Sequence, residues 1–567
     1  MRVRRRTLLG IVLAALLAAG LGTTPAAAAD PAPATAADPA AAPAVPASAV
    51  PAAVGDGERA TLLRYARDTW RSMVALTDPA SGLPADNLTG PVTAPARSAY
   101  TSPTNIGGYL WSTVVARDTH LIDRREAYAR MDRTLATLAR LDRHGPSGLF
   151  YNWYDPATGA KLTRWPVDGA PLTPFLSTVD NGWLAAALMV VTEAEPRLKR
   201  KAEALLRQMD FGFVYDPAPA REGVDAGLNR GGFWDTDPGG CSVVGNYRGR
   251  GPDVWYTCNS YDTAVTEARI ALYLGIALGQ IPAKAYFATW RTFPATCDWS
   301  WQEQQPVGTT RTYLGIPVYE GAYRYRGLQL VPSWGGDMFE ALMPDLFVPE
   351  AAWGPRSWAV NHPLTVRAQI EHGLAEARYG YWGFSPSSTP GGGYREYGVD
   401  AIGMNPDGYF SDAERTNYDA GFGDCRAGTA PTPAYGDGVV TPHASFLALP
   451  YARREALANL RRLRDLGAYG DGGFYDAVAV RSGTVARTYL SLDQAMVMGA
   501  LGNVLTGDLH RAFASYGAER AAAAAGDRPG SVLGPPLTGR PVPRTAQARA
   551  GIVTPRHTTV TDRGTFS

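Results

Sequence analysis

Carboxylic acids within apolar segments are the residues of this chain whose types and spacing best suit proton-transfer chemistry. Glu267 follows Thr266 in the segment 262–278, which is apolar beyond its first residues. Asp262 stands where a helix cap would, so we expect Glu267 at least one turn inside the helix, facing the protein interior. Burial there would raise the pKa of its carboxyl group, as a general acid requires. A salt bridge from Glu267 to Arg269 or to a neighbouring helix is the alternative.

Five further acids occupy comparable positions. Asp337 and Glu340 are three residues apart and share a helical face, so their pKa values can separate as acid–base work requires, or they can hold loops through arginines. Asp476 lies in a loop rich in glycine and aromatic residues and could hold a water molecule. Asp180 and Asp493 begin apolar segments, where we expect helix caps or hydroxyl-binding groups. Glu267, Glu340 and Asp476 are the catalytic candidates.

Aromatic residues crowd the loops that carry these acids. Flat aromatic faces pack against sugar rings and leave the polar edges of the sugar for hydrogen bonds, although many aromatic residues simply pack in a core. The residues expected to bind a ligand are Asp180, Asp262, Trp334, Asp337, Trp382, Tyr475 and Asp493.

Twelve segments with a helical period position these residues. Six have one charged face, as partly exposed helices do: 57–75, 123–141, 195–210, 282–290, 362–379 and 452–466. Six have few charges, as buried helices do: 103–117, 178–191, 262–278, 335–346, 441–449 and 492–505. The two classes alternate, and the long loops all precede segments of the second class. The pattern predicts an all-α fold, an (α/α)6 toroid of six inner and six outer helices with long loops on one face; a helical solenoid is the alternative.

The two ends of the chain differ in composition from its middle. Residues 1–29 predict a signal peptide, with a basic start, an apolar stretch too short to span a membrane comfortably and a small-residue cleavage site. Residues 30–55 are rich in alanine and proline and predict a disordered linker, and 519–567 predict a disordered tail. We therefore expect one catalytic domain at 56–518, secreted to the extracellular side; the Sec and Tat routes both stay open.

Composition and cysteine spacing limit the possible partners. The net charge is +1, which favours neither nucleic acid nor an anionic membrane. Four cysteines in an exported chain suggest disulfides, and of three connectivities we expect Cys241–Cys258 and Cys297–Cys425. No spacing typical of a zinc site occurs. We expect a monomer that binds a neutral glycan, without a cofactor, a metal or stable membrane insertion.

Several motifs resemble a known group of enzymes. The stretches SPTNIGGYLWSTVVARD, FLSTVDNGWLAAAL, YDTAVTEARIALYLGIALGQIP and SWGGDMFEALMPDLF resemble the glycoamylase-like domain of cyclic β-1,2-glucan synthases. GVVTPHASFLALPYARREALANLRRL and GFYDAVAV resemble endo-β-1,2-glucanases of the same group. The resemblance covers about residues 101–509. It implies an (α/α)6 fold, glycoside hydrolase or transglycosylase activity without a metal, and Glu267 as an acid, with Glu340, Asp476 and Asp493 as candidates for base or substrate binding.

These inferences together predict an exported glycoside hydrolase acting on a glycan, a β-glucan of the β-1,2 type. Glu267 would protonate the glycosidic oxygen while a second carboxylate activates water. Three alternatives stay open: a transglycosylase on the same glucan, a polysaccharide lyase, and a glycan-binding toroid without catalysis. A lyase would need a tyrosine or histidine base and a basic cleft for a uronate.

Overall fold

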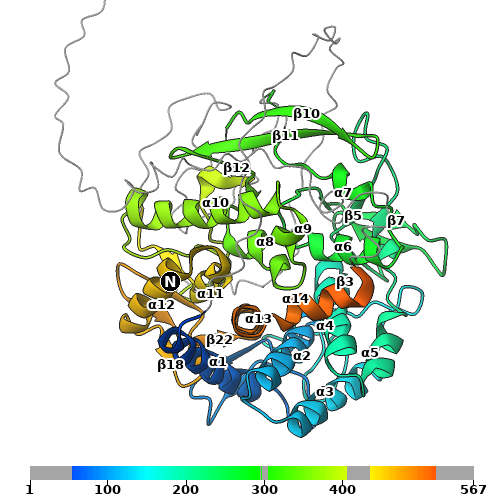
Figure 1. Cartoon of the computed structure of the whole chain (residues 1–567). Coiled ribbons are helices and arrows are strands. Elements are labelled where there is room, and N and C mark those ends of the chain that lie inside the picture. The colour runs from blue at the N-terminus through cyan, green and yellow to red at the C-terminus, as the bar shows by residue number, and fades with distance from the viewer. Residues whose placement is uncertain (1–53, 294, 297–303, 405–434, 519–567) are drawn as a thin grey trace, which may run out of the picture.

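The structure is a computed structural model, which describes residues 54–293, 295–296, 304–404 and 435–518 (Figure 1). Six helices with few charges pack on one another in its interior. They are α2 (Pro103–Asp118), α4 (Thr178–Ala194), α6 (Arg269–Ala277), α8 (Met338–Leu342), α11 (Pro442–Leu447) and α13 (Ser491–Leu505). Helix α2 contacts α4 and α13, α4 contacts α6, and α11 contacts α8 and α13.

A second set of helices covers the first. It comprises α1 (Asp56–Leu76), α3 (Arg124–Leu138), α5 (Lys199–Leu206), α7 (Ala285–Ala288), α9 (Glu350–Trp353), α10 (Trp358–Glu371), α12 (Leu449–Asp465) and α14 (Asp508–Phe513). Helices α3, α5, α10 and α12 pack on α2, α4, α8 and α11 respectively, and α1 packs on α13. The fold is therefore helical, with buried helices covered by a second set, although α7, which was predicted to have an exposed face, is buried along its whole length.

The chain is not helical throughout, as the all-α expectation implied, because the long loops contain strands. Those before α6 are β1 (Asn87–Thr89), β2 (Ala96–Arg97), β3 (Phe175–Ser177), β4 (Tyr215–Asp216), β5 (Leu228–Arg230), β6 (Gly232–Trp234), β7 (Ser242–Gly245), β8 (Val254–Thr257) and β9 (Ser260–Tyr261). They form three sheets, ordered β2-β1-β22, β3-β6-β8-β7 and β4-β5-β9, the first of which also includes β22 (Thr488–Leu490) from a later loop. The loops gain stability from this pairing because backbone groups that leave a helix must find other partners.

The later loops also contain strands that pair through their backbone groups. Their strands are β10 (Val307–Tyr313), β11 (Ile316–Tyr325), β12 (Leu328–Leu330), β13 (Ser333–Trp334), β14 (Ser387–Ser388), β15 (Tyr394–Arg395), β16 (Gly403–Met404), β17 (Val439–Val440), β18 (Tyr469–Gly470), β19 (Gly473–Phe474), β20 (Ala477–Ala479), β21 (Thr484–Ala486) and β22 (Thr488–Leu490). The longest pair, β10 and β11, is an antiparallel hairpin in which Val307 lies opposite Ala322 and Tyr313 opposite Ile316. It extends along one edge of the molecule (Figure 1).

Helices α5, α6, α7 and α8 are shorter than the predicted segments. Helix α6 begins at Arg269 rather than at residue 262, because the preceding segment pairs with Trp290 instead: the Trp290 N–H donates to the Asp262 carbonyl at 2.6 Å and the Ala264 N–H to the Trp290 carbonyl at 2.8 Å. Asp262 is therefore not a helix cap, and Glu267 precedes the helix rather than lying within it. The same pairing shortens the predicted helix at 282–290 to α7.

Small residues let the buried helices approach closely. A β-carbon placed on Gly107 of α2 would lie 3.1 Å from the Cα of Leu184 on α4, and one on Gly182 of α4 would lie 3.1 Å from the side chain of Ala271 on α6. Both distances are shorter than an ordinary van der Waals contact, so a larger side chain would push the helices apart. The glycines thus permit the close packing of these buried helices.

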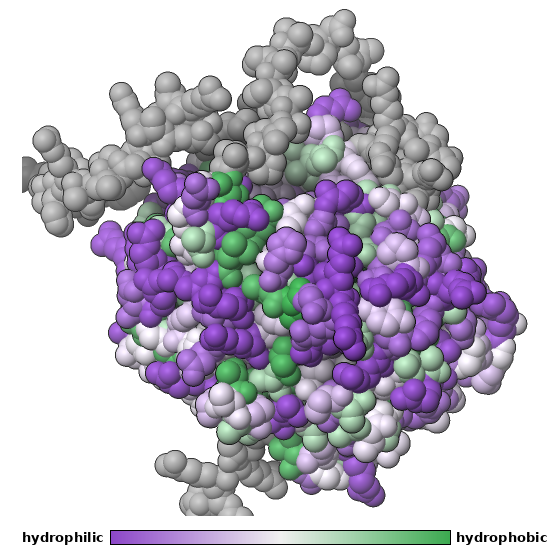
Figure 2. Space-filling view, turned by 60° about the horizontal axis from the view of Figure 1, so that its bottom comes forward, coloured by the Kyte–Doolittle hydropathy of each residue, from purple (hydrophilic) through white to green (hydrophobic). Residues whose placement is uncertain are grey.

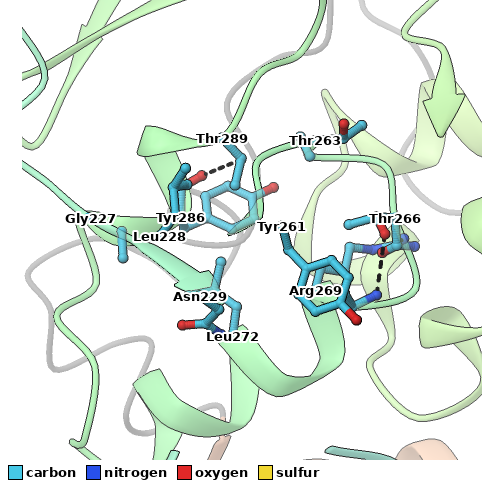
Figure 3. A pocket seen from close by; sticks show the side chains of 13 residues that line it. Gly227, Leu228, Asn229, Tyr261, Thr263, Thr266, Arg269, Leu272, Tyr286 and Thr289 are labelled. Atoms are coloured by element: carbon cyan, nitrogen blue, oxygen red, sulfur yellow. Dashed lines mark hydrogen bonds between the residues drawn. The ribbon is translucent and has the colours of Figure 1, made fainter. Parts of the chain in front are cut away.

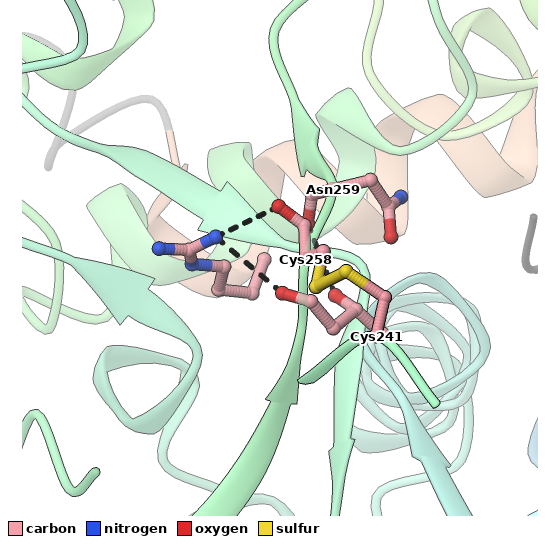
Figure 4. The surroundings of a disulfide bond; sticks show 5 residues. Cys241, Cys258 and Asn259 are labelled. Carbon is pink, nitrogen blue, oxygen red and sulfur yellow. Dashed lines mark hydrogen bonds between the residues drawn. A yellow bond between two sulfur atoms is a disulfide. The ribbon is translucent and has the colours of Figure 1, made fainter. Parts of the chain in front are cut away.

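The first predicted disulfide is present. Cys241 and Cys258 are bonded, with 5.7 Å between their Cα atoms, and join β7 to the end of β8 (Figure 4). An Arg230 N–H donates to the Cys258 carbonyl at 3.0 Å and fixes the same corner. Cys297 and Cys425 lie outside the described residues, as do the predicted signal peptide, nearly all of the linker and the tail.

The surface view in Figure 2 is mostly hydrophilic, with hydrophobic side chains in small groups. Within the described ranges, no helix is both long and apolar enough to cross a membrane.

Candidate functional site

Eight carboxyl groups interact electrostatically with one another at one end of the buried helices. They are Asp86, Asp180, Glu267, Asp337, Glu340, Glu396, Asp476 and Asp493. Six of them were predicted from sequence, and the structure brings these six together. We call these eight residues the acid cluster.

Glu267 is buried at the turn that precedes α6. Its side chain is 8% exposed, and its Oε2 accepts a hydrogen bond at 2.7 Å from the indole N–H of Trp183 on α4. Burial raises the pKa of Glu267 well above its ordinary value, and the negative charge of Glu340 raises it further. A carboxyl group in such surroundings keeps its proton near neutral pH and can donate it to a leaving group.

Glu340 on α8 holds the backbone of that turn. Its Oε2 accepts hydrogen bonds from the Glu267 backbone N–H at 2.6 Å and from the Thr266 hydroxyl at 2.7 Å. Burial raises the pKa of Glu340 to about 7, although both hydrogen bonds favour the ionised form. Asp337 caps α8 by accepting from the Glu340 N–H at 2.8 Å, and burial raises its pKa well above the usual range.

A buried ion pair ties the two segments together behind these acids. The guanidinium of Arg269 on α6 donates to both carboxylate oxygens of Glu350, at 2.7 and 2.8 Å. It also donates to the carbonyls of Thr266 at 2.7 Å and of Glu340 and Ala341 at 2.8 Å. Burial alone would raise the pKa of Glu350, but the charge of Arg269 lowers it to about 2. The salt bridge considered for Glu267 is thus made by Glu350.

Within the acid cluster, Asp476 and Asp493 form a second pair of carboxyl groups. Burial raises the pKa of both, that of Asp493 to about 7, and the negative charge of Asp493 raises the pKa of Asp476 further. Two neighbouring buried carboxyl groups do not both ionise readily near neutral pH. Oδ2 of Asp476 accepts from the Ser388 N–H at 2.7 Å, and Oδ2 of Asp493 lies 2.7 Å from Nδ1 of His443.

Asp180 and Asp86 complete the cluster on the side of α2 and α4. Asp180 accepts from the Thr104 hydroxyl at 2.6 Å and from the Asn152 amide at 3.0 Å. Asp86 accepts from the Asn105 amide at 2.9 Å, and burial raises its pKa. The sequence analysis missed Asp86 because this residue lies in a loop, outside any apolar segment. Its distance in sequence from the other acids of the cluster does not mark it as part of the site.

The aromatic predictions have mixed outcomes. Trp334 and Tyr475 are half-buried in loops beside the site, and Tyr475 contacts Tyr489 with 4.9 Å between ring centres. The structure places Trp382 in the core, with its side chain 1% exposed and its backbone held by Asn459. Tyr394, which was not singled out as a ligand-binding residue, interacts with acids on both sides of the cluster, Asp493 and Glu267 among them.

Asp262 is the one predicted acid outside the cluster. It interacts instead with Arg221, and burial raises its pKa to about 6. A small pocket lies nearby, behind Thr266, and Figure 3 shows the side chains that line it, among them Asn229 and Tyr261.

Two groups of residues within the described chain have spacings that a metal ion could use. His443, Asp476 and Asp493 each offer a ligand atom within 4.8 Å of the others, as do Asp345, Glu350 and His362. Both ring nitrogens of His443 already make hydrogen bonds, and its pKa is lowered to about 4 by burial. The second group is neutralised by the bidentate ion pair of Glu350.

Comparison with known proteins confirms the resemblance predicted from the motifs. Residues 259–516 match the Glycoamylase family model, described as "Putative glucoamylase", and residues 64–216 match a model described as a protein of unknown function, DUF3131. The fold is shared with an endo-β-1,2-glucanase from Chitinophaga pinensis, solved with sophorotriose and glucose (TM-score 0.55, 16% identity, 83% of this chain and 98% of that one). It is also shared with an endo-β-1,2-glucanase from Talaromyces funiculosus (TM-score 0.52, 12% identity, 81% and 86% covered). The fold is therefore that of the helical glucoamylase-like enzymes.

Among curated proteins, the chain is similar to the cyclic β-(1,2)-glucan synthase NdvB of Rhizobium meliloti (strain 1021). The two are 24% identical over an alignment of 581 positions, which covers 78% of this chain and 18% of the relative. The chain thus spans less than a fifth of that relative's length.

Proposed function

We propose that this protein is an exported glycoside hydrolase that cleaves a β-glucan of the β-1,2 type, built on an (α/α)6 toroid. The observation that carries the proposal is the pair formed by Glu267, whose pKa is raised well above its ordinary value, and Glu340, which fixes its backbone. The endo-β-1,2-glucanases that share the fold support the substrate class. The one disulfide of the described residues is compatible with export.

In the proposed reaction Glu267 donates its proton to the glycosidic oxygen as the bond to the anomeric carbon breaks. Trp183 orients the carboxyl group, and Glu340 holds its backbone through the 2.6 Å hydrogen bond. The second carboxylate comes from the pair of Asp476 and Asp493, of which the ionised member can take a proton from an attacking water. Asp180 binds a sugar hydroxyl beside them.

The charge of the site distinguishes this proposal from a lyase. A lyase must neutralise the carboxylate of a uronate, and the acid cluster would repel one. A transglycosylase remains compatible with the same residues, because a sugar hydroxyl can replace water as the acceptor. The two activities differ in their products.

The proposal is tested by incubating the purified protein with linear β-1,2-, β-1,3- and α-glucans. We expect new reducing ends from β-1,2-glucan alone, and NMR of the fresh products shows the anomer formed. Products longer than the substrate, without a net gain of reducing ends, would show transglycosylation. Release of unsaturated sugars, or no change in any glucan, would contradict the proposal.

A further inference from the structure

Beside the acid cluster, three aromatic rings form a group that the reaction described above does not use. Tyr100 contacts Trp165 with 4.6 Å between ring centres and Trp153 with 5.5 Å, and the two tryptophans are 6.0 Å apart. All three side chains are half-buried, so part of each remains in solvent. We call these three residues the aromatic group.

The aromatic group is joined to the acid cluster by two asparagines. The Asn87 amide donates both to the Tyr100 hydroxyl at 3.0 Å and to the Asp86 carboxylate at 3.1 Å. Asn152, which directly precedes Trp153, donates to Asp180 at 3.0 Å. The rings therefore continue the acid cluster on the side of α2 and α4.

The backbone around the tryptophans is well fixed. The Trp165 N–H donates to the Ala170 carbonyl at 2.7 Å, and the Gly169 N–H donates back to the Trp165 carbonyl at 2.8 Å. The Trp153 carbonyl accepts from the Leu162 N–H at 2.9 Å. Rings held in this way lose little conformational freedom when they bind a partner, which favours a binding role.

We propose that Tyr100, Trp153 and Trp165 form a subsite that stacks on glucosyl rings of the glycan chain next to the one being cleaved. The inference rests on the proposed function and adds the place where the substrate extends. Aromatic faces suit the apolar faces of sugar rings, and the acids and asparagines beside them suit the hydroxyl groups on the ring edges. A core-packing role alone would not need half-exposed rings beside a polar cluster.

The direct test is the binding of β-1,2-linked glucose oligomers, short and long, to the Trp165→Ala protein by calorimetry. Stacking of one ring contributes enough that its loss weakens binding of long oligomers by roughly three- to tenfold, with short ones nearly unchanged. Trp165→Phe, which keeps an aromatic face, should restore most of the affinity. Tyr128→Ala removes a half-buried ring from the outer helix α3 and should bind like the wild type.

The outcomes separate this inference from the proposed function. If the wild type binds β-1,3- or α-glucan oligomers instead, the proposed substrate is wrong, and the same variants measure the subsite with that glycan. Equal affinity of wild type and Trp165→Ala for long oligomers, in a variant with an unchanged Tm, would overturn the subsite. So would the failure of the wild type to bind any of these glycans.

Discussion

The backbone N–H of Glu267 donates a hydrogen bond to the carboxylate of Glu340 at 2.6 Å. Because one acid positions the chain that carries the other, the two are not interchangeable. Glu267 presents its carboxyl group to Trp183, whereas Glu340 uses an oxygen to hold the turn. This geometry supports the proposal that Glu267 donates the proton and that Glu340 positions it.

Removing the Trp183 hydrogen bond should change the pH dependence of activity. The indole N–H favours the ionised form of Glu267, so its loss in Trp183→Phe raises the pKa of that carboxyl group. We expect the alkaline limb of the kcat/KM profile to move to higher pH. A shift to lower pH, or none in a variant that keeps its fold, would count against Glu267 as the group that must be protonated.

Stability should fall as the pH rises from 6.5 to 8. The pKa of Glu340 is about 7 in the folded protein, above its value in the unfolded chain, so the native state binds the extra proton and loses this advantage as the pH passes 7. His443, with its pKa lowered to about 4, acts in the opposite direction only below about pH 6.5.

The pH effect is measured as the change of Tm between pH 6.5 and 8. Glu340→Gln should show a smaller fall than the wild type, and Glu203→Gln on the outer helix α5 should show the same fall. A wild-type Tm that rises over this interval would contradict the burial of a protonated carboxyl group at Glu340.

The ion pair of Arg269 and Glu350 should be the most costly of the described pairs to break. Glu350→Gln leaves a buried guanidinium without its counter-charge, which costs about 3–5 kcal/mol of unfolding free energy. Arg207→Ala removes a solvent-accessible pair with Glu203 at the end of α5 and should change the unfolding free energy by less than about 1 kcal/mol. Denaturant unfolding of the two variants compares these effects. Similar small losses of unfolding free energy would show that the protein does not depend on the Arg269–Glu350 ion pair.

The disulfide should stabilise the loop between β7 and β8. Closing a loop of 17 residues restricts the unfolded chain by about 3 kcal/mol, so the double change Cys241→Ser and Cys258→Ser should lower the unfolding free energy by that amount. Because the bond lies at the end of β8, outside the acid cluster, kcat should stay close to the wild-type value. An unchanged unfolding free energy would show that the loop is already fixed by Arg230.

The sequence predicted much of the site because helix amphipathicity depends on local spacing. An apolar segment interrupted by an acid, as at Glu267 and Glu340, indicated a buried carboxyl group, and both side chains are buried. Contacts between distant residues were not predictable in this way. Trp290 pairs with Asp262, so that α6 begins later in the sequence than predicted, and Asn459 holds the backbone of Trp382 in the core. Asp86 joins the cluster through tertiary contacts alone, which no periodic pattern reports.

The most direct test of the central claim is the rate at which Glu267→Gln cleaves linear β-1,2-glucan. The glutamine keeps the shape of the side chain and can still accept from Trp183, but it has no proton to donate. We predict a kcat at least about a hundredfold below that of the wild type, with binding of the glucan and the Tm preserved. A wild-type rate in this variant, or no cleavage of the glucan by the wild-type protein itself, would contradict the account.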